Sequence, residues 1–535
     1  MRNKYIFQLI LSVILLLPLM VAAEENMYVM SLGKNWEIEG DLPTHAMLVS
    51  LQGIANTDAP RLYFLYPEDW DFKFSAPLLN YYQRTRKMDF DTLQTVEDAL
   101  EKLAQYAKGY VVWDKSVRTS LIVSFTVAGL EKAIVVSEEL IPLVEKFGLK
   151  KTEDFRGKFV GKTDYEIYQW AFEKYWQRCN HEYLIYMGGH AGKVMKPGVA
   201  DFGILKQAFF TDASTDPADT LEFQFANKVF GHMKPLSMVM GWHSYGKDLE
   251  AQHVSLASQY ALRVEGLHTL PNMSFNSQIP TTPGYRFKNN HNVKPGKTYK
   301  PENKVYISFI QTDCLGLGAW TEPGRGDIPY AWEVTMNWVW LAPAMMQFFY
   351  DEATPNDYFL GSLGGPGYMY PRSIPKKYLP LVVKKAYELM NTLDLNVFEI
   401  MEHSNYWQSG GVDDDVPEEI IDAYYKGMPD AIGFVSGYRP GHTFTVKGGR
   451  PFISFDYYLS EKRDEDEAAS DLIELANMNK KRPYFLLIHV REFGHIERVK
   501  RILAKLGDEF ELVPLDVFLK MAGENFTFKI RYGQE

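Results

Sequence analysis

Short apolar segments recur about once in every 25 to 50 residues from residue 231 to the C-terminus, and this repeat constrains the fold most. Most of them lack polar–apolar alternation, and a helix-like or loop-rich stretch follows each one. Such strands are typical of parallel sheets whose two faces are both covered. The repeat therefore predicts an α/β fold with a C-terminal (β/α) barrel, regular or irregular. The expected strands are 236–241, 262–273, 304–312, 358–363, 396–401, 431–436, 451–455, 484–490 and 510–513.

The N-terminal half is expected to contain smaller α/β units. Two β-branched runs, 110–113 and 133–136, are separated by a helix-like segment. An amphipathic helix is predicted over 96–106 with Thr95 as its N-cap. A second helix follows Thr163, and we interpret its aromatic stripe as core packing. The expected divisions are a signal peptide over 1–23, α/β domains over 24–107 and 108–230, and the barrel domain over 231–535.

The first 23 residues have the three parts of a secretory signal peptide. Arg2 and Lys4 precede an apolar stretch from Ile6 to Met20, and small residues lead to Ala23. A membrane anchor is the alternative interpretation, which Pro18 disfavours. We expect a secreted or periplasmic protein without stable membrane insertion after cleavage.

The net charge argues against a nucleic-acid-binding protein, and the cysteine content excludes a disulfide scaffold. The formal net charge is −11, and no dense basic stripe or zinc-finger spacing is present, so a nucleic acid is not expected as a partner. Cys179 and Cys314 are the two cysteines of the chain, which excludes a disulfide scaffold. We favour two buried free thiols, and one disulfide between the two cysteines is the alternative.

Candidate site residues are chosen by their place at strand ends, because catalytic groups of parallel barrels lie at the carboxyl ends of the strands. Asp313 and Glu402 each follow an expected strand directly, and Glu492 follows another. Carboxylates together with aromatic side chains are typical of carbohydrate sites, and glycosidic cleavage requires two carboxyl groups, so we predict Asp313 and Glu402 as the catalytic pair with Glu492 as a further candidate. Aromatic faces suit the C–H faces of sugar rings. The candidate substrate-binding residues are Trp242, His243, Trp320, Tyr368, Tyr370, His403, Trp407, Tyr438, Asp456, His489 and Arg491.

No cofactor or metal is assigned from the sequence. The acidic run Asp413–Asp415 precedes an amphipathic helix, so we interpret it as a helix cap rather than as a calcium site. His489 and His495 lie six residues apart, a spacing that does not suit one helix face.

One loop resembles the signature of a known family. Residues 365–371 read Gly-Pro-Gly-Tyr-Met-Tyr-Pro after an apolar strand, and the glycines and prolines form a stiff frame that presents Tyr368 and Tyr370. This run resembles the motif that names the GxGYxYP family, and residues 51–56 and 325–329 resemble other segments of the family. The resemblance implies small N-terminal domains followed by a glycoside hydrolase domain, and a carbohydrate ligand. We expect an exported enzyme that acts on a poly- or oligosaccharide through paired carboxylates.

The chain departs from the family pattern after the strand at 304–312. Many members carry Asp-Gly-Asp-Asn there, whereas this chain has Asp-Cys-Leu-Gly at 313–316, so Leu315 replaces the second acid. One alternative function is therefore a catalytically inactive carbohydrate-binding barrel. The other is a metal-dependent hydrolase or deacetylase, which requires Asp313, His489 and either His243 or His403 to converge.

Overall fold

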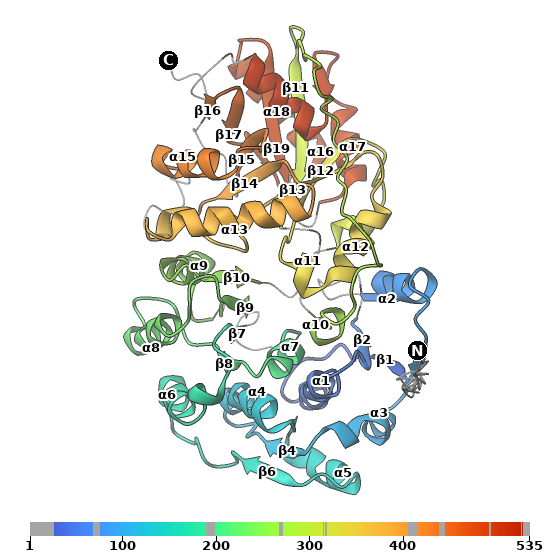
Figure 1. Cartoon of the computed structure of the whole chain (residues 1–535), viewed down its shortest axis with the longest axis vertical. Coiled ribbons are helices and arrows are strands. Elements are labelled where there is room, and N and C mark those ends of the chain that lie inside the picture. Colours follow the sequence, from blue (N-terminus) through green and yellow to red (C-terminus); the bar gives the residue numbers. More distant parts are fainter. Residues whose placement is uncertain are drawn as a thin grey trace, which may run out of the picture.

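The computed structural model describes residues 26–67, 75–188, 198–244, 246–266, 271–313, 315, 318–404, 416–437, 444–491, 494–525 and 527. The expected signal peptide lies outside these residues. Over the described ranges, no helix has both the length and the apolar character needed to cross a bilayer. Helices and strands alternate in three small units and one larger C-terminal unit, and the C-terminal unit occupies the upper part of Figure 1.

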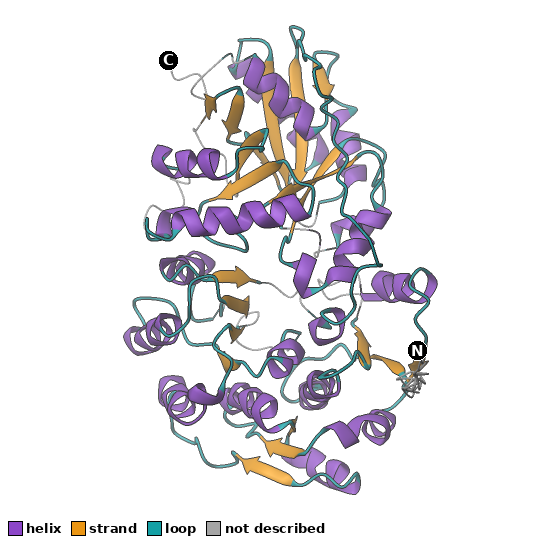
Figure 2. Ribbon diagram, in the orientation of Figure 1, coloured by secondary structure: helices purple, strands orange, loops and turns teal. Residues whose placement is uncertain are grey.

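Each of the three small units is built on a parallel sheet. The strands are β1 (Met27–Ser31), β2 (Leu62–Leu65), β3 (Phe90–Thr92), β4 (Gly109–Val112), β5 (Ala133–Val136), β6 (Lys151–Asp154), β7 (Tyr183–Met187), β8 (Phe209–Thr211), β9 (Met238–Trp242) and β10 (Arg263–Glu265). The sheet orders are β2-β1-β3 in the first unit, β5-β4-β6 in the second and β10-β9-β7-β8 in the third. Helices cover these small sheets (Figure 2).

The helices of these units include the two whose N-caps were predicted. They are α1 (Leu42–Ala55), α2 (Ser75–Arg84), α3 (Val96–Leu103), α4 (Arg118–Glu131), α5 (Ile141–Lys146), α6 (Asp164–Tyr175), α7 (Ala200–Leu205), α8 (Thr220–Gly231), α9 (Glu250–Gln259) and α10 (Met273–Asn276). Thr95 and Thr163 cap α3 and α6 through capping boxes, which confirms both predictions. Tyr168, Phe172 and Tyr175 of α6 are buried, as expected for core packing.

Two strands that we expected to begin the C-terminal sheet belong to the third unit instead. β9 pairs with β7, and β10 pairs with β9. The apolar pattern of these strands predicted that they were buried in a parallel sheet, but periodicity alone does not tell which sheet a strand joins. The C-terminal sheet therefore begins with the strand at 305–311.

The C-terminal unit contains a ten-stranded sheet that is curled into a half-barrel. Its strands are β11 (Val305–Gln311), β12 (Tyr330–Val334), β13 (Asp357–Gly361), β14 (Val397–Met401), β15 (Gly433–Gly437), β16 (Phe444–Lys447), β17 (Arg450–Ile453), β18 (Tyr457–Leu459), β19 (Tyr484–Val490) and β20 (Phe510–Leu512). The order is β16-β17-β15-β14-β13-β12-β11-β19-β18, with β20 against β11. Only the β16–β17 pair is antiparallel among the pairs of this sheet in the described chain.

The two sides of the curl approach each other through consecutive residues. β17 pairs with β15, β18 pairs with β19, and residues 454–456 connect β17 to β18. The Asp456 amide also donates to the Leu487 carbonyl of β19 at 2.8 Å. The sheet therefore encloses a concave inner face.

Helices cover the outside of the curl, and one helix lies against its inner residues. The helices are α11 (Trp338–Leu341), α12 (Pro343–Glu352), α13 (Leu379–Thr392), α15 (Glu418–Gly427), α16 (Glu465–Met478), α17 (Ile496–Leu503) and α18 (Leu515–Glu524). Phe518 and Leu519 of α18 pack in one cluster with Tyr306, Tyr358 and Phe485, which lie near the amino ends of their strands. The inner face is therefore apolar at its amino end. This arrangement leaves polar inner side chains at the carboxyl end.

Segment 279–303 contains no helix or strand and runs along the C-terminal sheet (Figure 1). β13 and β14 share a single paired position, Gly361 with Phe398. Near this gap, the Asn289 side chain donates to the Phe359 carbonyl at 2.8 Å and accepts from its amide at 2.9 Å. The Asn289 side chain thus forms the two backbone hydrogen bonds with Phe359 that a paired strand would otherwise form.

Candidate functional site

The signature loop joins the C-terminal sheet to the third unit. Tyr368 and Val264 of β10 form an antiparallel bridge, with N–O distances of 2.8 and 3.1 Å. The side-chain amide of Asn337 donates to the Glu265 carboxylate at 2.8 Å and contacts the Pro366 carbonyl. The carboxyl end of β13 therefore faces the third unit.

Four predicted substrate-binding rings form a continuous chain at this junction. Trp242 stacks on Tyr368 with centroids 6.0 Å apart, Tyr368 contacts Tyr370 at 5.3 Å, and Tyr370 contacts His403 at 6.3 Å. The Tyr368 side chain is 6% exposed and Tyr370 is 0% exposed. Packing accounts for both tyrosines, and a role for these rings in ligand binding stays a prediction.

Glu402 lies at the end of β14 and is bound by backbone amides. Its carboxylate accepts from the Arg372 amide and from the Ser404 amide, both at 2.8 Å. Burial raises the pKa of Glu402, and these hydrogen bonds oppose the rise. The carboxylate therefore holds the two chain segments that follow β13 and β14 together.

A group of acids lies inside the curl. Strand register places Glu333 beside Leu360, Glu399 beside Val435, and the histidine of β19 beside Ile310. Paired residues of parallel strands point to the same face, and this is the face that carries the inner apolar cluster. The side chains that meet near the carboxyl end of this face are Glu333, Glu399 and His489.

The three side chains are close together and buried. One donor atom from each lies within 4.8 Å of the other two. Apart from contacts within the cluster and one contact of Glu333 with the Asp313 backbone, both Glu333 oxygens, Glu399 Oε1 and both His489 nitrogens lack a hydrogen-bond partner in the described part of the chain. Buried polar groups of this kind are rare and indicate a functional site or a bound group.

Burial and mutual repulsion control the charge of the cluster. Burial raises the pKa of Glu333 well above its usual range, and the carboxyls of Glu399 and Asp313 raise it further. Burial also raises the pKa of Glu399, while contacts with Glu333 and with the Leu363 amide oppose the rise. Both effects favour the protonated form of a carboxyl in the Glu333–Glu399 pair.

Strained backbone flanks the cluster on two sides. Asp313, at the carboxyl end of β11, has a φ of 62°, and Leu363, after β13, has a φ of 70°. Neither residue is glycine, so each conformation costs free energy. The Leu363 amide donates to Glu399 Oε2 at 3.2 Å, and half-buried Asp313 lies near Glu333. Both residues with positive φ therefore lie beside the buried acids.

The other predicted site residues have separate locations. Trp320 packs against Trp332 at 5.1 Å on the outer face, so the sheet separates its ring from the acids. Asp456 accepts from the Tyr484 hydroxyl at 2.9 Å and from the Leu487 amide at 3.0 Å. His243 lies 3.1 Å from Asp248, and Arg491 lies 3.6 Å from Glu461. The predictions for Trp407, Tyr438, Glu492, Asp413–Asp415 and Cys314 concern residues outside the described ones, and Cys179 is a buried free thiol.

Sequence analysis missed Glu333 and Glu399 although it selected His489 and Asp313. Each glutamate lies within an otherwise apolar segment, Tyr-Ala-Trp-Glu-Val in β12 and Val-Phe-Glu-Ile-Met in β14. A carboxylate inside a strand that is buried on both faces is costly without a purpose. That cost was the signal available in the sequence.

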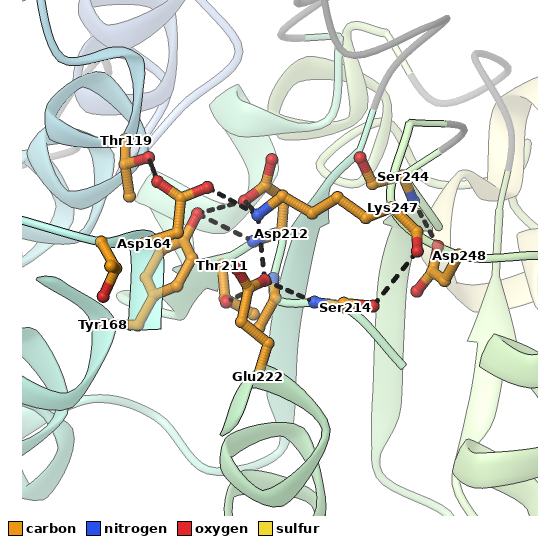
Figure 3. Close-up of polar contacts among 12 residues, drawn as sticks. Thr119, Asp164, Tyr168, Thr211, Asp212, Ser214, Glu222, Ser244, Lys247 and Asp248 are labelled. Atoms are coloured by element: carbon orange, nitrogen blue, oxygen red, sulfur yellow. Dashed lines mark hydrogen bonds and ion pairs between the residues drawn. The ribbon is translucent and has the colours of Figure 1, made fainter. Parts of the chain in front are cut away.

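A second polar cluster lies where the strand ends of the third unit meet the second unit (Figure 3). Lys247 Nζ contacts carboxylate oxygens of Asp164 at 2.7 Å, Glu222 at 3.0 Å and Asp212 at 3.2 Å. Arg118 forms a further ion pair with Asp212. Because these charges are paired with one another, we interpret the cluster as an ion network between the two units.

The comparisons agree with this architecture. Family profiles match residues 26–106 as "GxGYxYP_N 1st domain", 107–179 as "GxGYxYP_N second domain", 181–278 as "GxGYxYP third domain" and 303–523 as "GxGYxYP putative glycoside hydrolase C-terminal domain". A crystal structure described as a putative hydrolase from Bacteroides thetaiotaomicron VPI-5482 is similar in fold, with a TM-score of 0.75 and 18% sequence identity. The similarity covers 94% of this chain and 96% of that chain. No curated protein matches the sequence.

Proposed function

Because the chain belongs to the GxGYxYP family, we propose that it hydrolyses glycosidic bonds of a poly- or oligosaccharide at the carboxyl end of the curled sheet. The observation that carries this proposal is the convergence of Asp313, Glu333 and Glu399 there. Glycosidic cleavage requires one carboxyl that protonates the leaving oxygen and a second that activates water or attacks the sugar. The three acids supply both groups.

The surroundings of the acids suggest their roles. Burial raises the pKa of both Glu333 and Glu399, so this pair is assigned as the proton donor. Asp313 is half-buried at the end of β11, where water has access, so it is assigned as the base or nucleophile. In this assignment, Leu315 stands where many family members carry an additional acid, and the reaction does not require that acid.

The proposal extends to the architecture and to the location of the protein. β17 and β18 act as one interrupted strand between β15 and β19, and the sheet then works as a (β/α) barrel. Active sites of such barrels lie at the carboxyl ends of the strands. The signal-peptide pattern at 1–23 supports export to the periplasm or the medium, where polysaccharides are encountered.

A substrate screen followed by one substitution tests the function. Purified protein is assayed against polysaccharides and aryl glycosides, with ligand-induced shifts in Tm measured in parallel. On the best substrate, Glu333→Gln is expected to lower kcat by about 100-fold or more, because removing an acid–base group has an effect of this size. Glu474→Gln, an exposed change on α16, is the matched control and is expected to keep wild-type kcat.

Two results would contradict the proposal. Unchanged kcat in Glu333→Gln would remove the buried pair from the reaction. Tm shifts with sugars but no turnover in the wild type would favour the alternative of a carbohydrate-binding protein without activity.

A further inference from the structure

We infer that Glu333, Glu399 and His489 bind one divalent transition-metal cation, of the zinc class, inside the curled sheet. The three residues come from β12, β14 and β19, and one donor atom of each lies within 4.8 Å of the other two. The cation would bind at the site of the proposed function. The inference rests on that function only in assuming that a reaction takes place at this site.

The charge of the cluster is the first argument. Two carboxyl groups are buried side by side, and in the described ranges neither forms an ion pair with a lysine or arginine. Like charges in an apolar interior do not both ionise unless a cation compensates them. A divalent cation would balance the two ionised carboxylates and leave the cluster neutral, and water bound to the cation would then take the role of proton donor from the glutamate pair.

His489 is the second, independent argument. Its side chain is fully buried, and both ring nitrogens lack a hydrogen-bond partner within the part of the chain that the structure describes. The ring stacks on Phe455 with centroids 4.0 Å apart and an interplanar angle of 18°, which fixes its orientation. A buried imidazole that faces two carboxylates has the arrangement of a metal ligand.

The donor set selects the class of cation. Carboxylate oxygens alone suit magnesium or calcium, whereas an imidazole ligand favours zinc and similar transition metals. Three protein ligands leave a coordination position for water or substrate, as in catalytic zinc sites. Among the described residues the set contains no thiolate, so it differs from a structural thiolate site.

Zinc uptake by matched variants tests the inference. Untagged full-length protein is stripped with a chelator and titrated with Zn²⁺, and bound metal is measured by elemental analysis. The wild type is expected to bind about one zinc per chain. His489→Phe keeps an apolar ring beside Phe455 and is expected to lower the zinc affinity by more than about 100-fold. Glu402→Gln, a buried glutamate at the end of the same strand as Glu399, is expected to retain the wild-type affinity.

If a variant fails to fold, a measurement on the wild-type protein still tests the inference. X-ray absorption at the zinc edge should show nitrogen and oxygen ligands at about 2.0–2.2 Å, with imidazole scattering and no sulfur. No zinc uptake by the wild type, a sulfur ligand, or unchanged affinity in a folded His489→Phe variant would overturn the inference.

The two proposals fail in different ways. Zinc bound by these residues without turnover of any glycan would leave the cation site standing and remove glycosidic hydrolysis. Full turnover in zinc-free protein that also takes up no zinc would do the reverse.

Discussion

Glu399 has room inside the curled sheet because the adjacent strand carries glycine at position 437. A Cβ at this position would lie 2.5 Å from Glu399 Oε1 and 2.7 Å from Cδ. Side chains do not approach so closely, so either Glu399 or the end of β15 would have to move. The placement of the acid pair therefore depends on a residue that has no functional group.

We predict that Gly437→Ala lowers kcat by about 100-fold, because displacing a catalytic group by about 1 Å has an effect of this size. The free energy of unfolding should fall by about 1–3 kcal/mol through overpacking. Gly507→Ala is the control, since a Cβ there meets nothing within 4 Å. Wild-type kcat in Gly437→Ala would show that the position of Glu399 does not matter for the reaction.

At the scale of elements, the signature loop packs the third unit against the C-terminal sheet. The Tyr368 hydroxyl contacts the Glu250 carboxylate and lies 3.0 Å from the Tyr370 hydroxyl, while the Tyr370 amide donates to Ser258 Oγ at 3.0 Å. Glu250 and Ser258 belong to α9. The loop thus connects to both a strand and a helix of the third unit.

Tyr368→Phe should reduce the free energy of unfolding by about 1.5–3 kcal/mol, because a part-buried hydrogen bond to a charged group is lost while the ring stack on Trp242 remains. Tyr387→Phe removes the same kind of contact, to Asp430, at an exposed position and should cost less than about 1 kcal/mol. Urea unfolding of both variants provides the comparison. Equal costs would mean that the loop does not stabilise the junction.

Sequence patterns predicted elements better than they predicted the site. β19 matches the expected 484–490 residue for residue, and capping chemistry located the starts of α3 and α6. β12 was missed because Tyr330–Val334 mixes aromatic residues with a glutamate. Its Glu333 meets Glu399 only through strand order and register, which no local pattern encodes.

At the scale of the whole molecule, the ion network around Asp212 connects the second and third units. Burial would raise the pKa of Asp212, but Arg118, Lys247 and the Tyr168 hydroxyl outweigh burial and lower this pKa to about 2. Glu222 of the same network shows a shift opposite to that of Asp212, because burial raises its pKa. Ionised Asp212 therefore stabilises the fold above its ordinary pKa of 3.8, and this contribution is lost as the pH falls toward about 2.

Asp212→Asn is expected to reduce the free energy of unfolding at pH 7 by about 3–5 kcal/mol, because Arg118 and Lys247 lose a buried counter-charge. The variant should also lose less stability than the wild type between pH 5 and pH 3, because it lacks this titration. Urea midpoints at these pH values measure both effects, with Asp508→Asn as an exposed control. A variant within about 0.5 kcal/mol of the wild type at pH 7 would rule out a stabilising network.

The central claim is that Glu333 and Glu399 inside the curl, rather than Glu402 at the end of β14, act with Asp313 in the reaction. Glu399 and Glu402 lie three residues apart, one inside the curl and one bound by two loop amides. Measuring kcat for Glu399→Gln and Glu402→Gln on the same substrate tests the claim most directly. We predict a loss of about 100-fold or more in Glu399→Gln and less than about 10-fold in Glu402→Gln. The opposite order, with Glu402→Gln the more damaging change, would contradict the account.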